Sequence, residues 1–493
     1  MTDRPVVLAV DQGSSSTKCI AVAENGSILG SATVPVSRAH PGPGWVEQDA
    51  TELWSSVLEA IDLVAAQVGP PIAALGIASQ RESALVWDRV TGEPAGPVLG
   101  WQDRRTADRA RQLRADDRAG LVEQVTGLPI DPMFSALKFQ WLLDAADPDR
   151  VRSRAGELAV GTIDAWLSFR LTGAHVIELG NASRTQLVDL ARGQWDDRLL
   201  ELFGVPRAVL PEIRSSDAHS TSRPLPRLGS VPVTAVLADS HADLFAHGVR
   251  SPGAVKATYG TGSSIMGLSP AGRPVASGLT RTIAWSTDAA EMAFEGNILS
   301  SGATVAWLAD LLGRDADDLA RLASDCPPDH GADIVPAFSG LGAPRWDGDA
   351  RASITGLTFG SGAAQLARAA FESIALQVED VLVAAEASLD RRIDTVLVDG
   401  GPVANDWLCQ LQSDLSQRTV LRPAVSECSA LGVAQLAGIS ADLWTDDEVR
   451  AWPTVLSTFE PSMAPEDAAR RRARWHDAVE RTRSRIHTPK EPA

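Results

Sequence analysis

Cysteine is scarce in this chain of 493 residues, which contains only four. They lie far apart, at Cys19, Cys326, Cys409 and Cys428, and none belongs to a C-x-x-C pair. Closely spaced cysteines are the usual sign of a structural zinc site or a disulfide framework, so the sequence argues against both. We therefore expect a reducing compartment, the cytoplasm.

Long apolar runs and an excess of positive charge are also missing. No stretch approaches the roughly 20 apolar residues that span a bilayer, and the first residues lack the basic-then-apolar order of a signal peptide. The 45 Lys and Arg residues are outnumbered by 63 Asp and Glu residues, which gives a net charge of −18. Because no overall positive field is present to neutralise phosphates, neither a nucleic acid nor a membrane is expected as a partner.

The chain does have the composition of a globular protein, with 44% hydrophobic and 22% charged residues. A chain of this length is too long for one hydrophobic core. Two domains are therefore expected.

The amino-terminal segment predicts a hairpin suited to an anion. Two apolar runs flank a polar turn that contains Asp11, Gly13 and three consecutive hydroxyl residues, Ser14, Ser15 and Ser16. Glycine lets the backbone approach a ligand, and successive amides in such a turn can form a concavity for phosphate oxygens. Asp11 could then bind a phosphate-bridging Mg²⁺. For this segment alone, an ordinary hairpin with a Ser-rich turn is the alternative.

The same layout occurs a second time. Residues 255–259 and 265–268 predict strands, and between them lies the small polar turn Gly260-Thr261-Gly262-Ser263-Ser264. Two phosphate-type hairpins, one opening each half of the chain, suggest a duplicated architecture with a ligand in the cleft between the halves.

Several further strands end in polar clusters. Residues 72–78 predict a buried strand leading to Arg81 and Glu82, residues 233–237 lead to Asp239, and residues 395–398 lead to Asp399. Strands that alternate with helices and carry polar residues at their ends are typical of an α/β fold with its ligand across those ends.

The helices are predicted from spacing and caps. Asp49 is expected to cap a helix over 51–68, and residues 101–105 are expected to open another. The stretch 137–196 is expected to be mainly helical, with a surface hairpin around 171–174. Beyond about residue 464 the sequence predicts a charged, solvated helix.

Eight motifs follow one another in an order known from one family. They are D-Q-G-S at 11–14, Q-R-E at 80–82, W-Q-D-R-R at 101–105, I-D-P-M-F-S at 130–135 with Lys138 and Trp141, N-A-S-R-T at 181–185, Y-G-T-G at 259–262, G-L-G-A-P at 340–344, and D-G-G at 399–401 with Asn405. The sequence thereby resembles the FGGY family of carbohydrate kinases, and the glycerol kinases among them in particular.

The resemblance implies two actin-like, ribonuclease H-like α/β domains, each with a mixed five-stranded sheet, flanking a cleft for ATP and sugar. Residues 1–245 would form the N-terminal domain, which binds the acceptor and carries the first phosphate hairpin and the catalytic base. Residues 246–493 would carry the second phosphate hairpin and bind adenine. ATP and Mg²⁺ are the implied cofactors, a small polyol or ketose the implied partner, and a homodimer or larger homo-oligomer the implied assembly.

Phosphoryl transfer needs donors around the phosphates, a cation, and a carboxylate that accepts the alcohol proton. By resemblance, Asp239 is the catalytic base, and Asp11 and Asp239 bind the metal. The residues that match nucleotide-binding positions are Ser14, Ser15, Ser16, Lys18, Gly260, Thr261, Gly262, Gly302, Gly401 and Asn405. A helix N-cap is the alternative role for Asp239, and plain turns are the alternative for the glycines.

For the acceptor, Arg81 and Glu82 match a clamp on two hydroxyls, and Trp101 matches an apolar wall for the carbon chain. A surface turn at 81–82 and a core position for Trp101 are the alternatives.

Three lining positions depart from glycerol kinases, which carry Tyr, Gln and Phe where this chain has Met133, Ser240 and Ser264. Near adenine, a position that is often Gln is Ala306. The smaller, hydroxyl-bearing lining predicts a polyol or ketose of four or five carbons as acceptor. A strict glycerol kinase, or a non-catalytic nucleotide-binding sensor or scaffold of the same fold, are the alternatives.

Overall fold

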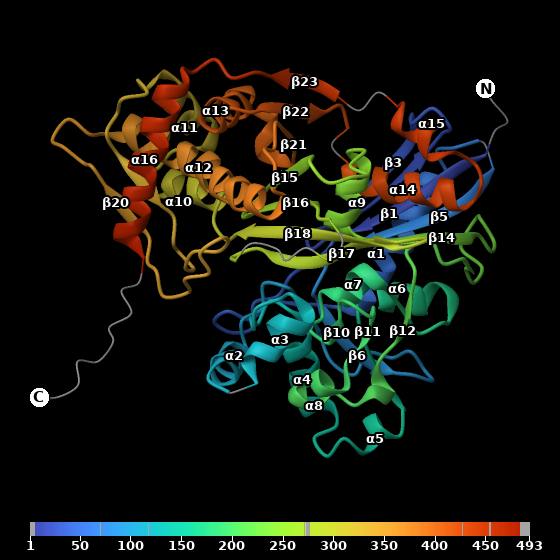
Figure 1. The fold of residues 1–493 in the computed structure, drawn as a ribbon. Helices are drawn as coiled ribbons and strands as arrows, with labels where there is room; N and C mark the ends of the chain where they lie inside the picture. Colours follow the sequence, from blue (N-terminus) through green and yellow to red (C-terminus); the bar gives the residue numbers. More distant parts are fainter. Residues whose placement is uncertain are drawn as a thin grey trace, which may run out of the picture. The chain divides into compact units, whose positions relative to one another are not determined.

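The computed structural model describes residues 5–69, 71–116, 118–270, 272, 277–425, 427–452 and 455–483. It divides into two compact units that interleave along the chain (Figure 1). Unit 1 comprises Met1–Arg250, Thr280–Ala293 and Glu427–Pro453, and unit 2 comprises Ser251–Leu279, Phe294–Ser426 and Thr454–Ala493. The sequence predicted two domains that are each continuous in the chain, with the boundary at residue 245. Two later segments belong with unit 1 instead, because α14 (Cys428–Ser440) packs on α9 (Asp239–Ala246), and β17 (Thr280–Ser286) packs on α7 (Leu179–Ser183).

The main sheet of unit 1 is mixed. Its strand order is β13-β14-β5-β1-β2-β3, in which β1 runs antiparallel to β2 and parallel to β5, and β5 runs parallel to β14. Five of these strands agree with the expected five-stranded sheet, and the sixth is the two-residue strand β13. The bounds are β1 (Val6–Gln12), β2 (Ser16–Val22), β3 (Ile28–Pro35), β5 (Ile72–Ser79), β13 (Ser220–Thr221) and β14 (Pro232–Ala238).

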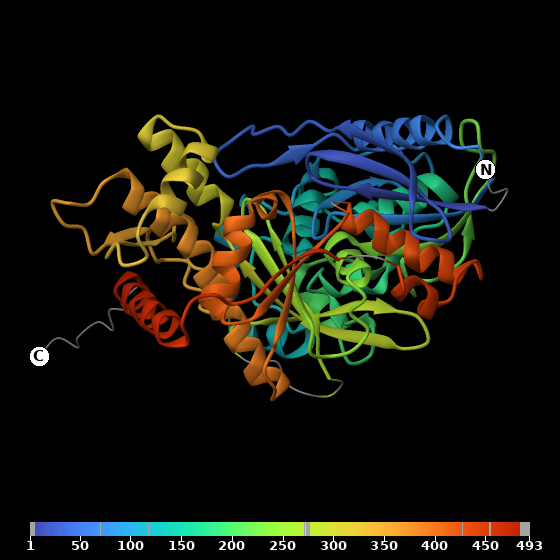
Figure 2. The same cartoon turned by 90° about the horizontal axis from the view of Figure 1, so that it is seen from above.

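Helices cover both faces of this sheet. On one face α1 (Ala50–Ala65) lies along β2 and β3 (Figure 2), burying Leu53, Val57 and Ile61. The Asp49 carboxylate caps this helix by accepting hydrogen bonds from the amides of Thr51 and Glu52, as predicted. On the other face α14 packs against β1, β5 and β14.

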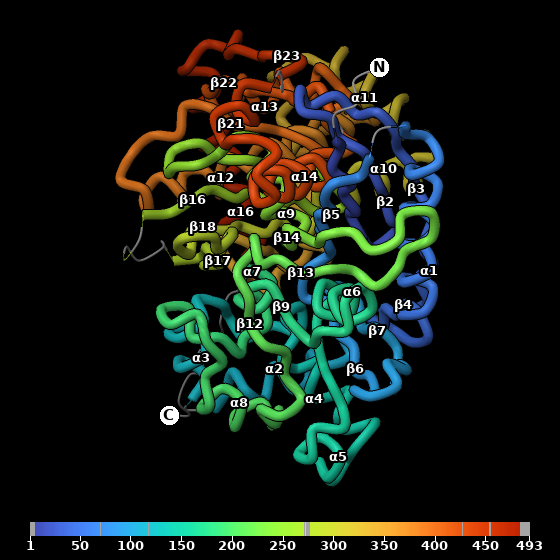
Figure 3. Tube along the Cα trace, turned by 90° about the vertical axis from the view of Figure 1, so that its right-hand side faces the viewer, coloured from blue at the N-terminus to red at the C-terminus, as the bar shows by residue number. Residues whose placement is uncertain are grey.

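Close backbone contacts hold α14 in place beside α9 (Figures 1 and 3). A Cβ atom at Gly432 would lie 1.7 Å from the carbonyl oxygen of Ala242 on α9, and one at Gly76 on β5 would lie 2.7 Å from the carbonyl oxygen of Val433. Any side chain at either position would force the elements apart. The two glycines therefore set the distance of α14 from its neighbours.

A second sheet in unit 1 has the order β4-β7-β6-β8, and four helices lie between β7 and β8 in the chain. The sequence prediction fails here at three places. Residues 158–162 form the buried strand β8, residues 171–174 are the end of α6 with Gly173 as a left-handed C-cap, and α2 begins at Ala107 rather than at 101. A short apolar run such as that of β8 fits a buried strand as well as a helix, so periodicity alone cannot separate them.

The remaining elements of unit 1 are short. They are β4 (Glu47–Gln48), β6 (Ala84–Asp88), β7 (Val98–Leu99), β8 (Leu158–Thr162), β9 (Val176–Glu178), β10 (Val188–Asp189), β11 (Gln194–Trp195), β12 (Glu212–Arg214), α2 (Ala107–Arg114), α3 (Ala119–Thr126), α4 (Ser135–Ala146), α5 (Val151–Arg154), α6 (Ile163–Thr172), α8 (Asp197–Phe203), η1 (Arg207–Val209) and α15 (Asp446–Arg450).

Unit 2 repeats the pairing of unit 1. Strand β15 runs antiparallel to β16 and parallel to β21, just as β1 pairs with β2 and β5, and β21 continues to β22 and β23. The second hairpin predicted from the sequence is therefore present, in the same sheet context as the first. The strands are β15 (Val255–Tyr259), β16 (Ser263–Leu268), β19 (Asp333–Val335), β20 (Ser353–Thr355), β21 (Thr395–Asp399), β22 (Thr419–Pro423) and β23 (Val455–Phe459), and β18 (Ala290–Ile298) crosses the unit boundary.

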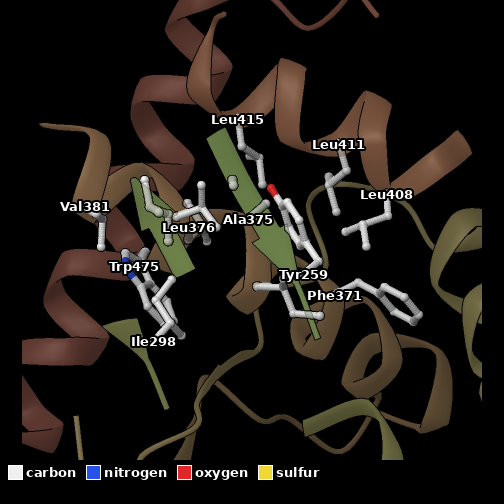
Figure 4. Close-up of a cluster of buried hydrophobic side chains, with 14 of the residues drawn as sticks. Tyr259, Ile298, Phe371, Ala375, Leu376, Val381, Leu408, Leu411, Leu415 and Trp475 are labelled. Carbon is white, nitrogen blue, oxygen red and sulfur yellow. The ribbon is translucent and has the colours of Figure 1, made fainter. Parts of the chain in front are cut away.

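The core of unit 2 lies between this sheet and its helices. Figure 4 shows Tyr259 of β15 among Leu376, Leu411 and Phe371, and its hydroxyl donates a 2.6 Å hydrogen bond to Oε1 of Gln412. The helices are α10 (Gly302–Leu312), α11 (Ala316–Asp325), α12 (Ala363–Leu389), α13 (Asp406–Ser416) and α16 (Pro465–Thr482), with η2 (Gly401–Ala404). Among the helices in the described ranges, none is at once long enough and apolar enough to cross a bilayer.

The prediction of a solvated helix after residue 464 is wrong for one face of α16. Trp475 is buried in the core (Figure 4). Arg471 contacts the buried Glu372 on α12 and, at 2.7 Å, Asp333. Glu372 also contacts Nε2 of His330 at 3.1 Å. Burial acts to raise the pKa of Glu372, but hydrogen bonds and charge from His330 and Arg471 outweigh it and lower that pKa to about 2. The residues after 483 lie outside the described ranges.

This ion cluster makes the stability of the chain sensitive to acid. Because the folded-state pKa of Glu372 lies below its ordinary value of 4.5, its ionised form stabilises the fold above pH 4.5, and this contribution is lost as the pH falls toward about 2. At pH 7, Glu372→Gln should lower the free energy of unfolding by about 3–5 kcal/mol, because it removes one charged partner from each of the buried Arg471 and Arg368. In denaturant unfolding, the gap between wild type and variant should narrow below pH 4.5, whereas a gap independent of pH would contradict the assignment.

The glycine contact of α14 gives a second stability prediction. Gly432→Ala should lower the free energy of unfolding by about 3 kcal/mol, because the added methyl group meets backbone rather than a movable side chain. Gly120→Ala is the matched control, since the described residues leave open space around that exposed position on α3. It should stabilise the chain by about 0.5–1 kcal/mol through helix propensity. Equal effects of the two substitutions would show that the α9–α14 contact is not tight.

Candidate active site

Parallel pairing brings the ends of three strands of unit 1 together. In the register, Asp11 of β1 lies opposite Ala78 of β5, and Ser79 of β5 lies opposite Ala238 of β14. The residues that follow, Gln80 and Asp239, therefore emerge at one edge of the sheet. The sequence-predicted residues Asp11, Arg81, Glu82 and Asp239 all derive from this edge.

Asp11 lies in a strongly acidic environment. Desolvation and the charges of Asp239 and Asp243 raise its pKa to about 7, although Lys18, its partner across the hairpin, acts in the opposite direction. Its Oδ1 atom is buried and makes no hydrogen bond to any described residue. A divalent cation bound there would satisfy this oxygen and offset the repulsion among the carboxylates. The all-oxygen donor set is the one that Mg²⁺ prefers, so the residues fit the metal that the resemblance implies.

Asp239 is the first residue of α9, and Ala238 occupies the cap position, so the alternative role as N-cap is wrong. Its side chain is 33% exposed, and Oδ1 lies 3.5 Å from Nε of Arg81. The amide of Ser240 donates a 2.6 Å hydrogen bond to the same oxygen. The carboxylate is thus oriented by a guanidinium and an amide while remaining accessible.

Arg81 and Glu82 are buried, with 8% and 5% exposure, so the alternative of a surface turn is wrong. Glu82 has a left-handed backbone at φ 58°, and its carbonyl oxygen accepts hydrogen bonds from Ser135 and Lys138 at 3.1 and 3.3 Å. Its carboxylate oxygen Oε1 accepts a 2.7 Å hydrogen bond from Nε of the fully buried Arg184. Together these contacts fix an unusual backbone and a side-chain direction that a flexible turn would not hold.

Arg184 and Lys138 support Glu82, and the sequence analysis gave them no role beyond membership in a motif. Lys138 also donates to the carbonyl oxygen of Met133, and burial lowers the pKa of its ammonium group to about 8. The sequence did contain a signal for these roles, because a lysine or arginine that lies among apolar residues is seldom buried without a charged or polar partner. The partner itself is distant in sequence.

Trp101 is half-buried rather than a core residue, and its indole Nε1 donates a 3.0 Å hydrogen bond to Oγ of Ser14 in the first hairpin. Ser14 in turn donates to Oε1 of Gln80 at 3.3 Å, and Gln80 also bonds to the side chains of Gln12 and Gln48. The hydroxyl of Ser14 is thus engaged within the protein. Ser15 is exposed and Ser16 is half-buried in the same turn.

The second hairpin, in unit 2, is held by backbone hydrogen bonds to the start of α10. The amides of Ser301 and Gly302 donate to the carbonyl oxygens of Thr261 and Gly260 at 2.8 and 2.9 Å. A Cβ atom at Gly262 would lie 2.3 Å from the carbonyl oxygen of Ile298, and one at Gly302 would lie 2.6 Å from that of Gly260. These glycines are therefore required by packing of the turn, while Thr261 at its tip is exposed.

Among the residues after β21, Gly400 rather than Gly401 is required for steric reasons. Gly400 has φ 94°, and a Cβ atom there would lie 2.0 Å from the carbonyl oxygen of Tyr259, whereas Gly401 has open space among the described residues. Asn405 caps α13, accepting from the amides of Trp407 and Leu408. The sequence analysis singled out Gly401 and passed over its neighbour.

The three lining residues lie in different settings. In unit 1, Met133 and Ser240 are half-buried. In unit 2, the hydroxyl of Ser264 donates a 2.8 Å hydrogen bond to Oε1 of Glu295, which is fully buried and also accepts from Asn297 at 3.1 Å. Glu295 was not singled out from the sequence. Ala306 lies exposed on α10.

Comparisons with known proteins identify the family of the chain. The model of the FGGY family of carbohydrate kinases matches residues 6–246 with its N-terminal domain and residues 255–441 with its C-terminal domain. The chain is 42% identical over 489 residues to a glycerol kinase of Rhodopirellula baltica, covering 97% of this chain and 90% of the relative. It is 41% identical over 486 residues to a glycerol kinase of Burkholderia ambifaria, covering 96% and 97%.

Solved structures show the same fold. The Plasmodium falciparum glycerol kinase with ADP matches with a TM-score of 0.90 at 29% identity, covering 98% of this chain and 99% of that one. A xylulose kinase from Rhodospirillum rubrum matches with a TM-score of 0.83 at 23% identity, covering 97% and 98%, which supports the fold alone. The family models span most of the chain and the sequence relatives nearly all of it: the chain belongs to the FGGY family of carbohydrate kinases.

Proposed function

We propose that this chain transfers the γ-phosphoryl group of ATP to a primary hydroxyl of a small polyol or ketose, with Asp239 as general base. Membership in the carbohydrate kinase family makes it a phosphotransferase with an alcohol acceptor. The observation that carries the assignment of the base is the accessible Asp239 carboxylate, held by Arg81 and the amide of Ser240 at the sheet edge where Asp11 also lies.

In this proposal, side chains of unit 1 bind the acceptor and accept its proton. Asp239 accepts the proton of the attacking hydroxyl, Arg81 and Glu82 bind neighbouring hydroxyls, and Trp101 faces the carbon chain. The carboxylate accepts this proton as the new bond to phosphorus forms, which raises the nucleophilicity of the alcohol oxygen. Because Arg184 fixes Glu82, the clamp is organised before the acceptor arrives.

The phosphate-binding role is assigned to the two hairpins. In unit 1 the residues are Ser14, Ser15, Ser16 and Lys18, with Ser14 contributing through its backbone because its hydroxyl is engaged. In unit 2 they are Gly260, Thr261 and Gly262, with Gly302, Gly401 and Asn405 assigned to the nucleotide. Asp11 and Asp239 would hold Mg²⁺, which when bound neutralises charge on the phosphate oxygens.

The role of the base can be tested by removing its charge. Asp239→Asn should lower turnover by about 10²- to 10⁴-fold, the effect typical of losing a general base. ATP affinity, measured by calorimetry, should stay within a few-fold of wild type, because the remaining phosphate donors are intact. Asp108→Asn is the matched control, since that aspartate is exposed on α2. A variant that kept a tenth of the activity would remove Asp239 from the role.

The acceptor is proposed to have four or five carbons. Ser240 and Met133 stand where glycerol kinases carry a longer amide and a rigid ring, and a small hydroxyl and a flexible thioether reduce the bulk at those positions. In unit 2, the buried Glu295 gives the Ser264 hydroxyl a fixed direction. A site with hydroxyl partners of this kind discriminates strongly in favour of a substrate that pairs with them, because a shorter substrate leaves them unpaired.

A substrate panel tests this proposal. Among glycerol, erythritol, erythrulose, ribulose, xylulose and their polyols, a compound of four or five carbons should exceed glycerol in kcat/KM by about 10-fold or more. Met133→Tyr combined with Ser240→Gln should shift the ranking toward glycerol by refilling the space. A highest kcat/KM for glycerol would contradict the enlarged pocket. No ATP consumption with any compound, from a folded sample that binds ATP, would favour a sensor over an enzyme.

A further inference from the structure

Three side chains with metal-ligating atoms meet where α9 packs on α14, within unit 1. They are Asp243 of α9, His247 at the C-cap of that helix, and Cys428, the first residue of α14. Their ligand atoms all lie within 4.8 Å of one another. Nε2 of His247 lies 3.8 Å from Oδ1 of Asp243. Ligands bound to one tetrahedral Zn²⁺ at 2.0–2.3 Å lie about 3.3–3.8 Å apart. Small side-chain rotations would therefore bring all three atoms onto one ion.

The backbone presets this arrangement. Asp243 and His247 are four residues apart and so share one face of α9. Cys428 is one turn before Gly432, whose contact with Ala242 fixes the distance between the helices. Asp243 and Cys428 thus lie on two packed helices and His247 caps the first of them, and such positions are held more precisely than positions on loops.

We propose that Asp243, His247 and Cys428 form a site for a divalent transition metal of the zinc class, with three protein ligands and one open coordination position. The donors are a carboxylate oxygen, an imidazole nitrogen and a thiolate sulfur, a set that suits zinc, whereas Mg²⁺ prefers oxygen alone. The side chains of Asp243 and His247 are only 5% and 4% exposed and Cys428 is buried, so a metal bound there would be shielded from solvent.

This site differs from the proposed Mg²⁺ site in ligands and in chemistry. The Asp11 and Asp239 pair offers only oxygens, and Asp243 follows Asp239 by one turn of α9. On binding, the thiol of Cys428 gives its proton to solvent and coordinates as thiolate, while His247 binds as neutral imidazole. The site also rests on no cysteine pair, which is why the scattered cysteines of the sequence gave no sign of it.

Cobalt is a spectroscopic probe for such a site. Metal-free full-length chain should be titrated with Co²⁺ in excess Mg²⁺, which occupies oxygen-only sites. A near-ultraviolet band from thiolate-to-cobalt charge transfer, together with visible bands of a four-coordinate ion, should grow to saturation at one ion per chain. Zn²⁺ should displace both. Absence of the charge-transfer band would overturn the proposal, and would show instead a cluster held by hydrogen bonds.

Variants assign the band to its ligands. Cys428→Ser should abolish the charge-transfer band, and His247→Gln should weaken Co²⁺ binding by about 10-fold or more. Cys326→Ser is the matched control, because Cys326 is a buried cysteine of unit 2. It should leave the band unchanged. A band that persisted in Cys428→Ser or vanished in Cys326→Ser would refute the site.

Calorimetry gives a readout that is independent of colour. Zn²⁺ titration in two buffers of different ionisation enthalpy should show release of about one proton per ion in the wild type and a loss of this release in Cys428→Ser. Circular dichroism must show that the variants are folded. If Cys428→Ser does not fold, His247→Gln tests the site instead, since glutamine keeps a polar side chain at the residue that caps α9. Unchanged Zn²⁺ affinity in that variant would overturn the proposal.

Discussion

The parallel pairing of β14, β5 and β1 is the constraint on which the site in unit 1 depends. Parallel strands end at the same edge of a sheet, so three segments far apart in the sequence deliver Asp11, Arg81 and Asp239 to one place. The cost is electrostatic, because Asp11 is buried where β1 ends and lies near other carboxylates, so desolvation and then their charge raise its pKa. The Mg²⁺ proposed above would relieve this repulsion, so the pairing that defines the fold also favours cation binding at the sheet edge.

Much of the fold could be predicted from local signals. The two hairpins, the strand at 72–78 and the capped helix α1 each rest on a pattern that is complete within a few residues. The failures have a different origin. The prediction missed the strand β8 because a short apolar run has no distinctive period. It missed the buried face of α16 because Arg471, which lies on that face, is charged. Its partners, Glu372 and Asp333, lie on other elements, and no local pattern reveals such pairing.

For the candidate site too, some residues could be predicted from local motifs and others could not. The family motifs located Asp239, Arg81 and Glu82, but the groups that position them come from elsewhere: Arg184 supports Glu82, and Glu295 directs Ser264. Gly400 was passed over for Gly401 because its reason lies in the carbonyl oxygen of Tyr259, on a different strand. Sequence reasoning thus finds the residues that stand in a motif and misses those whose role depends on a tertiary contact.

The return of residues 427–453 to unit 1 has a consequence for biosynthesis. The face of β1, β5 and β14 that α14 covers stays open to water until this late segment has left the ribosome, although the strands themselves are made first. Long-range contacts of this kind slow folding and prolong the exposure of apolar surface. The nascent chain therefore passes through a period in which nearly all of unit 1 exists without its cover. Fragments cut between the two matched family regions would remain in that state permanently.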